Sequence, residues 1–478
     1  MTATSVDLEM GTVARRSMWL SVASLVGSAL SVLTSFLLAR WLGPARFGRV
    51  QGVLLLYFYV ALLRSGAFES GMRRYIRLRA VGRDAEAVRA RDVGTTTDFL
   101  LSLVPAVGLV VWGCFAGGAL LRTGLFLAPL VVLSTVAASY AGAIRAADHR
   151  FDLVAASGMV RSLSYAALAL GGVAAYGDRA LFVAPAVADL VALAVLVRRR
   201  PRMEVRPTFD AALAKDLVRT GLALGALPAV YWVYRLVGTT SVALGTNVVT
   251  FGVFSFAAAP MAILLRAIGQ VESVLTPAVW GEIARDSGDR SWLPSADRVT
   301  TILFVVAGAA TNLGQAGFGP VVTHFLPAYA GAVPLFEILA LNIVLLSVGV
   351  VPSLVLRDEA TGAQNRYLGL WVVALAVNAA ANAIVLRAGY GAVAVAWNDV
   401  WVQALVLVAL FAMAARRLGV PGWGRRAGIG VPLAAITVLT MFGLRAAGGH
   451  LAIRCLVVAA VWGAVVWALR DRFRPVRR

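Results

Sequence analysis

Residues 36–53 read FLLARWLGPARFGRVQGV and join two apolar runs, one at 17–41 and one at 47–66. Each run has about the 20 residues that an α-helix needs to cross the hydrocarbon core of a bilayer. The connection between the runs is short, so this stretch predicts a hairpin of two membrane-spanning helices. The same pattern, an apolar run followed by a short and often basic connection, continues along the rest of the chain.

The composition also indicates a membrane protein. Of the 478 residues 60% are hydrophobic and only 14% are charged, whereas soluble domains carry about 25% charged residues. A net charge of +20 would suggest a nucleic-acid partner in a soluble protein. Here the basic residues lie in the connections between apolar runs, where membrane topology explains them, so we expect no nucleic-acid partner.

Several function classes lack their signatures in this sequence. There is no GxxxxGK[ST] phosphate-binding loop, and none of the three histidines lies in an HExxH motif. The two cysteines, Cys114 and Cys455, lie in distant apolar runs without disulfide or metal-ligand spacing. No connection exceeds about 30 residues, which leaves no room for a soluble catalytic domain. We therefore expect no enzymatic activity, no catalytic or metal-binding residues and no cofactor.

The hydropathy pattern predicts an all-α polytopic membrane protein with about fourteen transmembrane helices. The first run is too long for the apolar region of a secretory signal, so we interpret it as a membrane span. The predicted spans lie near 17–41, 47–66, 95–118, 123–143, 153–176, 179–197, 217–238, 248–270, 299–321, 334–356, 367–387, 391–415, 427–446 and 450–469.

The distribution of basic residues predicts the orientation in the membrane. With these spans, 31 of the 44 basic residues fall on one side and seven on the other. Cytoplasmic connections carry the excess of arginine and lysine in membrane proteins. We therefore predict a multi-pass protein of the cytoplasmic (inner) membrane with both termini in the cytoplasm.

Two segments about 200 residues apart share a spaced set of letters, which predicts an internal repeat. The first set is Phe47-Gly48, Leu62-Leu63-Arg64 and Glu69-Ser70, and the second is Phe251-Gly252, Leu264-Leu265-Arg266 and Glu272-Ser273. The repeat equates the second span with the eighth, and both run from outside to inside. It predicts two six-helix halves around a central cavity, an arrangement seen in transporters. The expected parts are an N-terminal half at 1–200, a cytoplasmic linker at 201–216, a C-terminal half at 217–417, and two additional helices with a basic tail at 418–478.

The string Ala39-Arg40-Trp41-Leu42-Gly43-Pro44-Ala45-Arg46-Phe47-Gly48 resembles the first hairpin of the polysaccharide biosynthesis and export family of flippases. These lipid-linked oligosaccharide flippases belong to the multidrug/oligosaccharidyl-lipid/polysaccharide exporter superfamily. Further segments resemble the family in the same order, namely 65–77, 270–283, 325–341 and 378–396, so the resemblance covers about 36 to 415. At the position of Arg64 the family pattern has a small or aliphatic residue, so the resemblance assigns Arg64 no role.

Charged side chains inside the predicted spans are the candidate functional residues, because an ionisable group at membrane depth is costly and usually faces a cavity or a partner. The candidate substrate-binding residues are Arg64, Arg266, Arg161, Arg235, Asp189 and Asp399.

Each candidate also has a structural explanation. Arg161 and Asp189 lie near mid-bilayer in neighbouring spans and can form a structural ion pair, or one of them can line the transport path. Arg64 and Arg266 lie about 17 residues into their spans, roughly 26 Å deep, where arginine can reach the cytoplasmic headgroups or a ligand. We expect Glu69 to pair with Arg73 four residues on. Five residues of helix would turn Glu69 about 140° away from Arg64.

The remaining intramembrane polar residues have similar alternatives. Arg219 and Arg454 are expected to be interfacial anchors at the ends of their spans, and Arg235 can be one. Asn378 and Asn382 are four residues apart on one helix face, where they can hydrogen-bond between helices or bind sugar.

The leading hypothesis is a flippase for a lipid-linked, polyprenyl-diphosphate oligosaccharide or polysaccharide precursor, working by alternating access. The resemblance implies this substrate class, and the partners expected with it are membrane lipids and the glycosyltransferases and polymerase of a glycan assembly pathway. Arginine fits it because guanidinium binds phosphate oxygens in bidentate fashion. The alternatives are a cation-coupled small-molecule or multidrug exporter of the same superfamily, and a non-transporting scaffold for glycan assembly.

Overall fold

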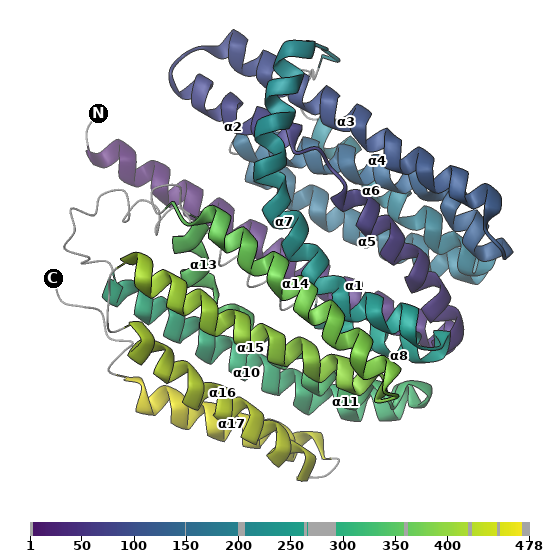
Figure 1. Cartoon of the computed structure of the whole chain (residues 1–478), viewed down its shortest axis with the longest axis vertical. Coiled ribbons are helices and arrows are strands. Elements are labelled where there is room, and N and C mark those ends of the chain that lie inside the picture. Colours follow the sequence, from purple (N-terminus) through teal and green to yellow (C-terminus); the bar gives the residue numbers. More distant parts are fainter. Residues whose placement is uncertain are drawn as a thin grey trace. The chain divides into compact units, whose positions relative to one another are not determined.

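The computed structural model of the chain describes residues 3–148, 150–198, 206–261, 265, 293–357, 362–418, 423–446 and 450–470. Regular secondary structure in these residues is helical throughout, as the sequence predicts (Figure 1). The chain divides into two compact units, Met1–Val233 and Tyr234–Arg478. The predicted linker at 201–216 lies partly outside the described residues, and the division into six-helix halves stays a prediction.

Unit 1 is a bundle in which neighbouring helices are mostly consecutive in the chain. Its elements are α1 (Ala3–Leu62), α2 (Ala67–Ala80), α3 (Asp84–Phe115), α4 (Ala119–Ala147), α5 (Phe151–Tyr176), the 3-10 turn η1 (Gly177–Arg179), α6 (Ala180–Arg198) and α7 (Ala211–Gly245), whose last part belongs to unit 2. The main packed pairs are α5 with α6, α1 with α5, α2 with α3, α4 with α6 and α3 with α4.

The hairpin predicted at 36–53 corresponds to a break within α1. Gly43 there has φ 67° and ψ 167°, and Pro44 follows it. Both break a helix, because a positive φ favours glycine and proline cannot donate the intrahelical hydrogen bond. Past the break, Tyr57 donates a hydrogen bond to the carbonyl of Gly124 on α4, which fixes the second arm of α1 in the bundle.

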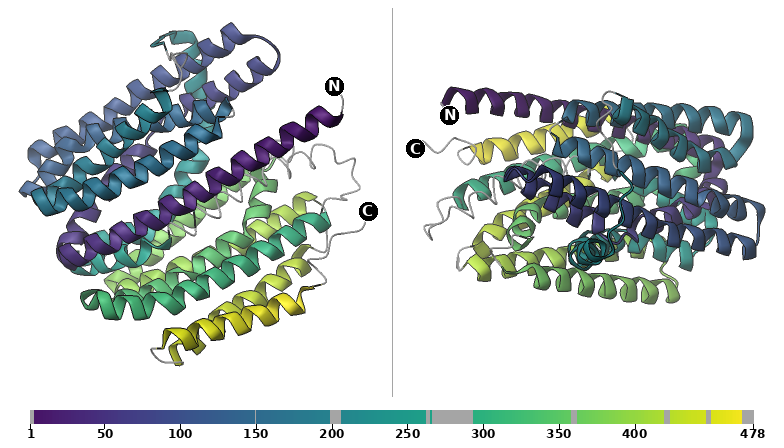
Figure 2. Two further views of the ribbon diagram at one scale, coloured as in Figure 1. Left: turned by 180° about the vertical axis from the view of Figure 1, so that it is seen from behind. Right: turned by 90° about the horizontal axis from the view of Figure 1, so that it is seen from above.

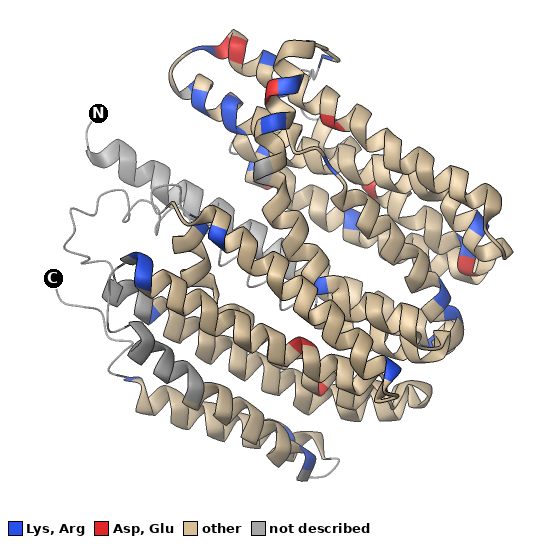
Figure 3. Cartoon of the chain, viewed as in Figure 1, with Lys and Arg blue, Asp and Glu red and all other residues tan. Residues whose placement is uncertain are grey.

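A polar cap, formed by α2 and the first half of α3, extends unit 1 beyond its apolar core. The segment 73–91, which we predicted as a connection, is mostly helical, because α2 and the polar first half of α3 run side by side there (Figures 1 and 2). Gly71 and Gly94 allow this approach: a Cβ on either would lie 2.7 Å from a carbonyl oxygen of the other helix. Basic and acidic residues gather on α2 and on the nearby ends of α3 and α7 (Figure 3).

Unit 2 also consists of helices. They are the rest of α7, α8 (Val248–Ala258), α10 (Leu293–Phe325), the 3-10 turn η2 (Pro327–Tyr329), α11 (Ala332–Leu339), α12 (Leu341–Val348), α13 (Val350–Arg357), α14 (Gln364–Arg387), α15 (Gly391–Leu418), α16 (Trp423–Ala446) and α17 (Leu451–Ala468). The span predicted at 334–356 is divided into α11, α12 and α13, with a bend of 49° before Val350.

The last two helices are joined to α10 by buried polar contacts. The indole of Trp462 donates to Oδ1 of Asn312 at 2.9 Å, and Nδ2 of Asn312 donates to the carbonyl of Thr437 at 3.1 Å. Arg454 is 8% exposed and donates to the carbonyls of Leu444 and Ala316. Our expectation that Arg454 is an interfacial anchor is therefore wrong, since its guanidinium satisfies backbone carbonyls inside unit 2.

Eight helical segments of the described residues are long and apolar enough to cross a membrane, or up to ten if two bent pairs each form one span. Two of the eight, Val26–Leu62 and Phe151–Arg198, each overlap two of the runs predicted from the sequence. The chain is thus an all-helical, multi-pass membrane protein, while the number of fourteen spans stays a prediction.

Candidate functional site

The stretch between α1 and α2 contains the first candidate, Arg64. Residues 63–65 are not helical, and Gly66 has φ 72°, in the left-handed region. A larger residue would also clash at Gly66, because a Cβ there would lie 2.2 Å from the carbonyl oxygen of Gly221 on α7. The hydropathy pattern predicts a continuous span through Arg64, and this prediction is wrong: Arg64 lies in a break.

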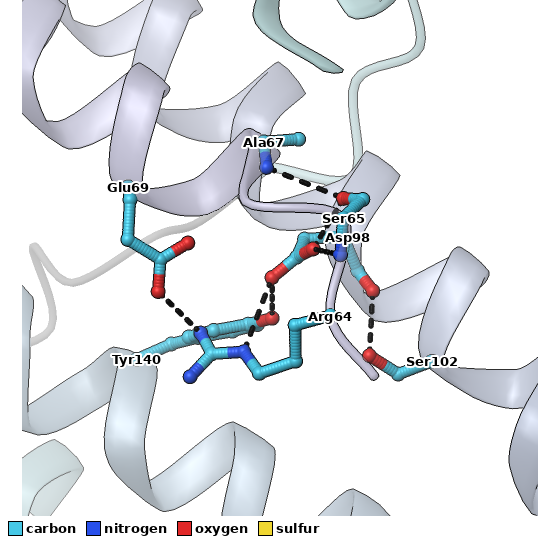
Figure 4. A network of polar contacts seen from close by, with 7 residues as sticks. All are labelled: Arg64, Ser65, Ala67, Glu69, Asp98, Ser102 and Tyr140. Carbon is cyan, nitrogen blue, oxygen red and sulfur yellow. Dashed lines mark hydrogen bonds and ion pairs between the residues drawn. The ribbon is translucent and has the colours of Figure 1, made fainter. Parts of the chain in front are cut away.

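A buried carboxylate on α3 holds this break in place (Figure 4). Asp98 is 0% exposed. Its Oδ1 accepts hydrogen bonds from the backbone N–H of Ser65, at 2.8 Å, and from the Ser65 hydroxyl. Its Oδ2 accepts from the hydroxyl of Tyr140 on α4 and lies 3.4 Å from Nε of Arg64. Asp98 thus connects α3 and α4 with the break.

The Arg64 guanidinium has two acidic neighbours and an aromatic one. Besides Asp98, its Nη2 lies 3.2 Å from Oε1 of Glu69 on α2. Its Cζ lies 4.7 Å from the centre of the Tyr140 ring, a cation–π geometry. That ring stacks on Phe68 with centroids 4.0 Å apart. The expectation that a helix turns Glu69 about 140° away from Arg64 is wrong, because the chain is not helical at residues 63–65.

We call Arg64, Ser65, Glu69, Asp98 and Tyr140 the Asp98 cluster. Two buried atoms in it, Nη2 of Arg64 and Oε2 of Glu69, have no hydrogen-bond partner among the described residues. Counting one cation and two carboxylates, the cluster carries a formal charge of −1. The Arg64 side chain is still 22% exposed, so its guanidinium is partly accessible from outside the cluster.

Arg161 and Asp189 form an ion pair, as one of our two explanations predicts. Nε of Arg161 on α5 donates to Oδ1 of Asp189 on α6, and Thr135 on α4 donates to Oδ2 at 2.5 Å. The Asp189 side chain is 1% exposed, while that of Arg161 is 49% exposed. The carboxylate is therefore part of the packing between three helices, and Arg161 keeps one side open.

In unit 2, Asp399 lies within a group of asparagines. Nδ2 of Asn378 and of Asn382, both on α14, lie 2.8 and 3.5 Å from Oδ1 of Asp399 on α15. Asn398 donates to Oδ1 of Asn382 at 2.9 Å. This geometry fits the interhelical hydrogen bonding expected for the two α14 asparagines, and it adds a carboxylate as their acceptor. Oδ1 of Asn378 is buried and has no hydrogen-bond partner among the described residues.

The structure says less about the remaining two candidates, Arg235 and Arg266. Arg235 is half-buried on α7. Arg266 lies outside the described residues, so the structure does not test its correspondence with Arg64 in the predicted repeat.

Three residues of the cluster, Ser65, Asp98 and Tyr140, were not among the candidates predicted from the sequence. Asp98 did carry a signal, because it is a charge at the start of the apolar stretch FLLSLVPAVGLVVW (99–112) and falls inside the span predicted at 95–118. Tyr140 carried none, since one tyrosine in an apolar helix is ordinary.

No protein-family model matches the sequence, and no curated protein matches it either. Solved structures do match its fold. The structure described as lipid II flippase MurJ in an inward closed conformation aligns with a TM-score of 0.71 at 12% identity, over 96% of this chain and 100% of that one.

Two further structures are transporters of the MOP superfamily. An inward-facing multidrug resistance MATE family transporter has a TM-score of 0.60 at 12% identity, over 85% of this chain and 94% of its own. A transporter from Pyrococcus furiosus Vc1 has a TM-score of 0.56 at 15% identity, over 86% and 97%. These identities establish the fold alone: the chain has the fold of the MOP-superfamily transporters.

Proposed function

We propose that this protein is a flippase that moves a lipid-linked, polyprenyl-diphosphate oligosaccharide or polysaccharide precursor across the cytoplasmic membrane by alternating access. The headgroup enters from the cytoplasmic leaflet, and the lipid tail stays in the bilayer. Two likenesses support the proposal. The motif at 39–48 resembles glycan flippases, and the fold aligns with a lipid II flippase at a TM-score of 0.71, against 0.60 for a multidrug transporter.

The observation that carries the proposal is the position of Arg64. Its guanidinium lies in a helix break, is partly exposed, and has a buried Nη2 without a hydrogen bond. A diphosphate offers several charged oxygens, and guanidinium binds such groups in bidentate fashion. Glu69 is the partner that a diphosphate would replace, because its contact with Arg64 lacks hydrogen-bond geometry and its side chain is 41% exposed.

This competition predicts that removing the charge of Glu69 strengthens substrate binding. In Glu69→Gln, Arg64 keeps Asp98 as its partner, so the fold is retained and the guanidinium is more available. We expect the Kd for a polyprenyl diphosphate in nanodiscs to fall by up to about fivefold, because an ion pair with an exposed partner contributes up to about 1 kcal/mol. Arg64→Lys keeps the charge but loses the planar fork, and we expect its Kd to rise by about tenfold.

The matched control is Glu86→Gln, which removes an exposed carboxylate from the same cap, where Glu86 pairs with Arg83 three residues earlier. It should leave the Kd unchanged. An unchanged Kd in Glu69→Gln would show that Arg64 only holds the helix break, and the diphosphate role would then be rejected. Export of the glycan from cells, measured at equal protein level, should rank the variants in the same order as their affinities for polyprenyl diphosphate.

A cation-coupled exporter is the second candidate, and Asp399 is the observation in its favour. Its half-buried carboxylate accepts hydrogen bonds from neutral amides and from no basic residue in the described part of the chain. Such a group suits a cation or a proton. Proteoliposomes separate the two functions: efflux of a cationic drug driven by an ion gradient, with no movement of polyprenyl diphosphate, would favour the exporter.

A further inference from the structure

A groove lies between α14 and α15 in unit 2. Its volume is about 560 Å³, within the range of about 300–1,000 Å³ of small-molecule sites. Arg366 lines one end, from the first turn of α14, together with Arg416 and Arg417 from the last turn of α15. Leu370, Val373 and Met413 line the apolar part further along the two helices.

The two ends of the groove differ in a way that matches a lipid. The arginines lie in the connections at 357–366 and 416–426, which the arginine distribution predicts to be cytoplasmic. Val373, two turns further along α14, is 59% exposed, so the apolar part opens to the surface of the helix pair. A charged end at the membrane surface and an open apolar end toward the bilayer core are what a phospholipid requires.

The three arginines have no acidic partner within the groove. None of its described lining residues is acidic, and none of the ion pairs between described residues includes Arg366, Arg416 or Arg417. Asp358 and Glu359 lie outside the described residues. Arg417 donates one hydrogen bond, to the carbonyl of Gly362 at 3.3 Å. The arginines of the cap in unit 1 differ, since Arg79 and Arg89 pair with aspartates at 2.6 Å.

We propose that this groove binds an anionic membrane phospholipid, with its phosphate on Arg366, Arg416 and Arg417 and an acyl chain along Leu370 and Val373. The lipid is a resident of the cytoplasmic leaflet and is not the translocated substrate, so the proposal is independent of the flippase function. Anionic lipids are enriched in that leaflet, and basic pockets between transmembrane helices on that side bind their headgroups. Guanidinium and phosphate match each other in geometry as well as charge.

Native mass spectrometry of the delipidated full-length protein tests the charged end. We expect phosphatidylglycerol to bind at low ratios and phosphatidylcholine not to compete. Each arginine near a membrane surface contributes about fivefold in affinity, so Arg366→Gln with Arg416→Gln should weaken binding by about 25-fold. The matched control, Arg387→Gln, removes an exposed arginine from the other end of α14. It should leave the binding of phosphatidylglycerol unchanged.

A second variant tests the apolar end without removing charge. A Cβ on Gly369 would meet nothing within 4 Å, so Gly369→Leu places a side chain in the open groove and should not destabilise the helix. We expect it to abolish binding of phosphatidylglycerol. Gly463→Leu, an equally open site on α17, is its control.

Three outcomes would overturn the proposal. The first is binding that survives both the double arginine variant and Gly369→Leu. The second is a preference for polyprenyl phosphate over phosphatidylglycerol, which would make the groove an entry site for substrate. The third is equal competition by inorganic phosphate, which would show an anion site without a lipid.

Discussion

Asp98 connects three parts of unit 1 through one carboxylate. It is fully buried, it accepts hydrogen bonds from Ser65 and Tyr140, and it lies beside the Arg64 guanidinium. Asp98→Asn keeps the shape, but it removes the charge and turns one acceptor into a donor that faces other donors. Because loss of one partner of a buried ion pair costs several kcal/mol, we expect the free energy of unfolding to fall by about 3 kcal/mol, measured by thermal unfolding in detergent.

The control for this variant is Asp178→Asn. Asp178 also pairs with an arginine, Arg46, but the pair is more open to solvent, with side-chain exposures of 13% for Asp178 and 49% for Arg46. Ion pairs of this kind contribute less than about 1 kcal/mol, so the free energy of unfolding of this variant should be close to that of wild type. Equal losses in the two variants would contradict the central place of Asp98 in the fold.

The sequence was informative about single charges but not about their partners. It identified Arg64, Arg161, Asp189 and Asp399 as costly residues inside the membrane, and each of them has polar contacts in the structure. The partner of Arg64 that it missed, Asp98, is 34 residues away in the sequence. Helical spacing predicts side-chain neighbours only three or four residues apart. Across a break in the helix this spacing no longer applies.

At the scale of elements, α2 and α7 approach each other at two glycines. A Cβ on Gly221 would lie 2.2 Å from the carbonyl oxygen of Gly66, so the two backbones are in contact where the α1–α2 break lies. Gly221→Ala should force the two elements apart. Overpacking of this kind costs about 1–3 kcal/mol, and we expect a matching fall in thermal stability.

Gly225→Ala is the control one turn further along α7. A Cβ there would lie 3.6 Å from Cα of Gly66, an ordinary contact, and alanine favours the helix by about 1 kcal/mol. This variant should be as stable as wild type or more stable. A destabilised Gly225→Ala beside an unaffected Gly221→Ala would show that the two elements do not meet at Gly221.

The last two helices depend on a further set of contacts between elements. Arg454 donates to the carbonyls of Leu444 and Ala316, so it joins α17 to α16 and α10. Arg454→Met leaves these buried carbonyls without donors, and we expect a loss of about 3 kcal/mol. Arg470→Met, which removes an exposed arginine stacked on Trp467, should cost less than about 1 kcal/mol. Similar losses in both would mean that α16 and α17 are not held by Arg454.

At the scale of the whole molecule, the distribution of arginine predicts that both termini are cytoplasmic. Single cysteines in a background with Cys114 and Cys455 replaced by serine test this orientation. Gly117→Cys, in the exposed turn between α3 and α4, should react with a membrane-impermeant maleimide in intact cells. Arg83→Cys, between α2 and α3, should react only after the cells are opened. The reverse pattern would invert the topology and would place the Asp98 cluster at the outer side.

The sequence by itself determined that the chain is a helical, multi-pass membrane protein. This property follows from local composition, because a bilayer requires about 20 apolar residues for each crossing. The number of spans and the orientation that the arginine distribution indicates stay predictions. Even the break at Gly43-Pro44 was visible as a turn between two runs.

Only the tertiary structure decided which charges meet. It showed the break at Arg64, the buried carboxylate that holds it, the role of Arg454 and the groove between α14 and α15. The physical reason is that these features depend on contacts between segments far apart in sequence. Apolar helices of similar composition can pack in many ways, and the few polar side chains take the partners that the packing brings within reach.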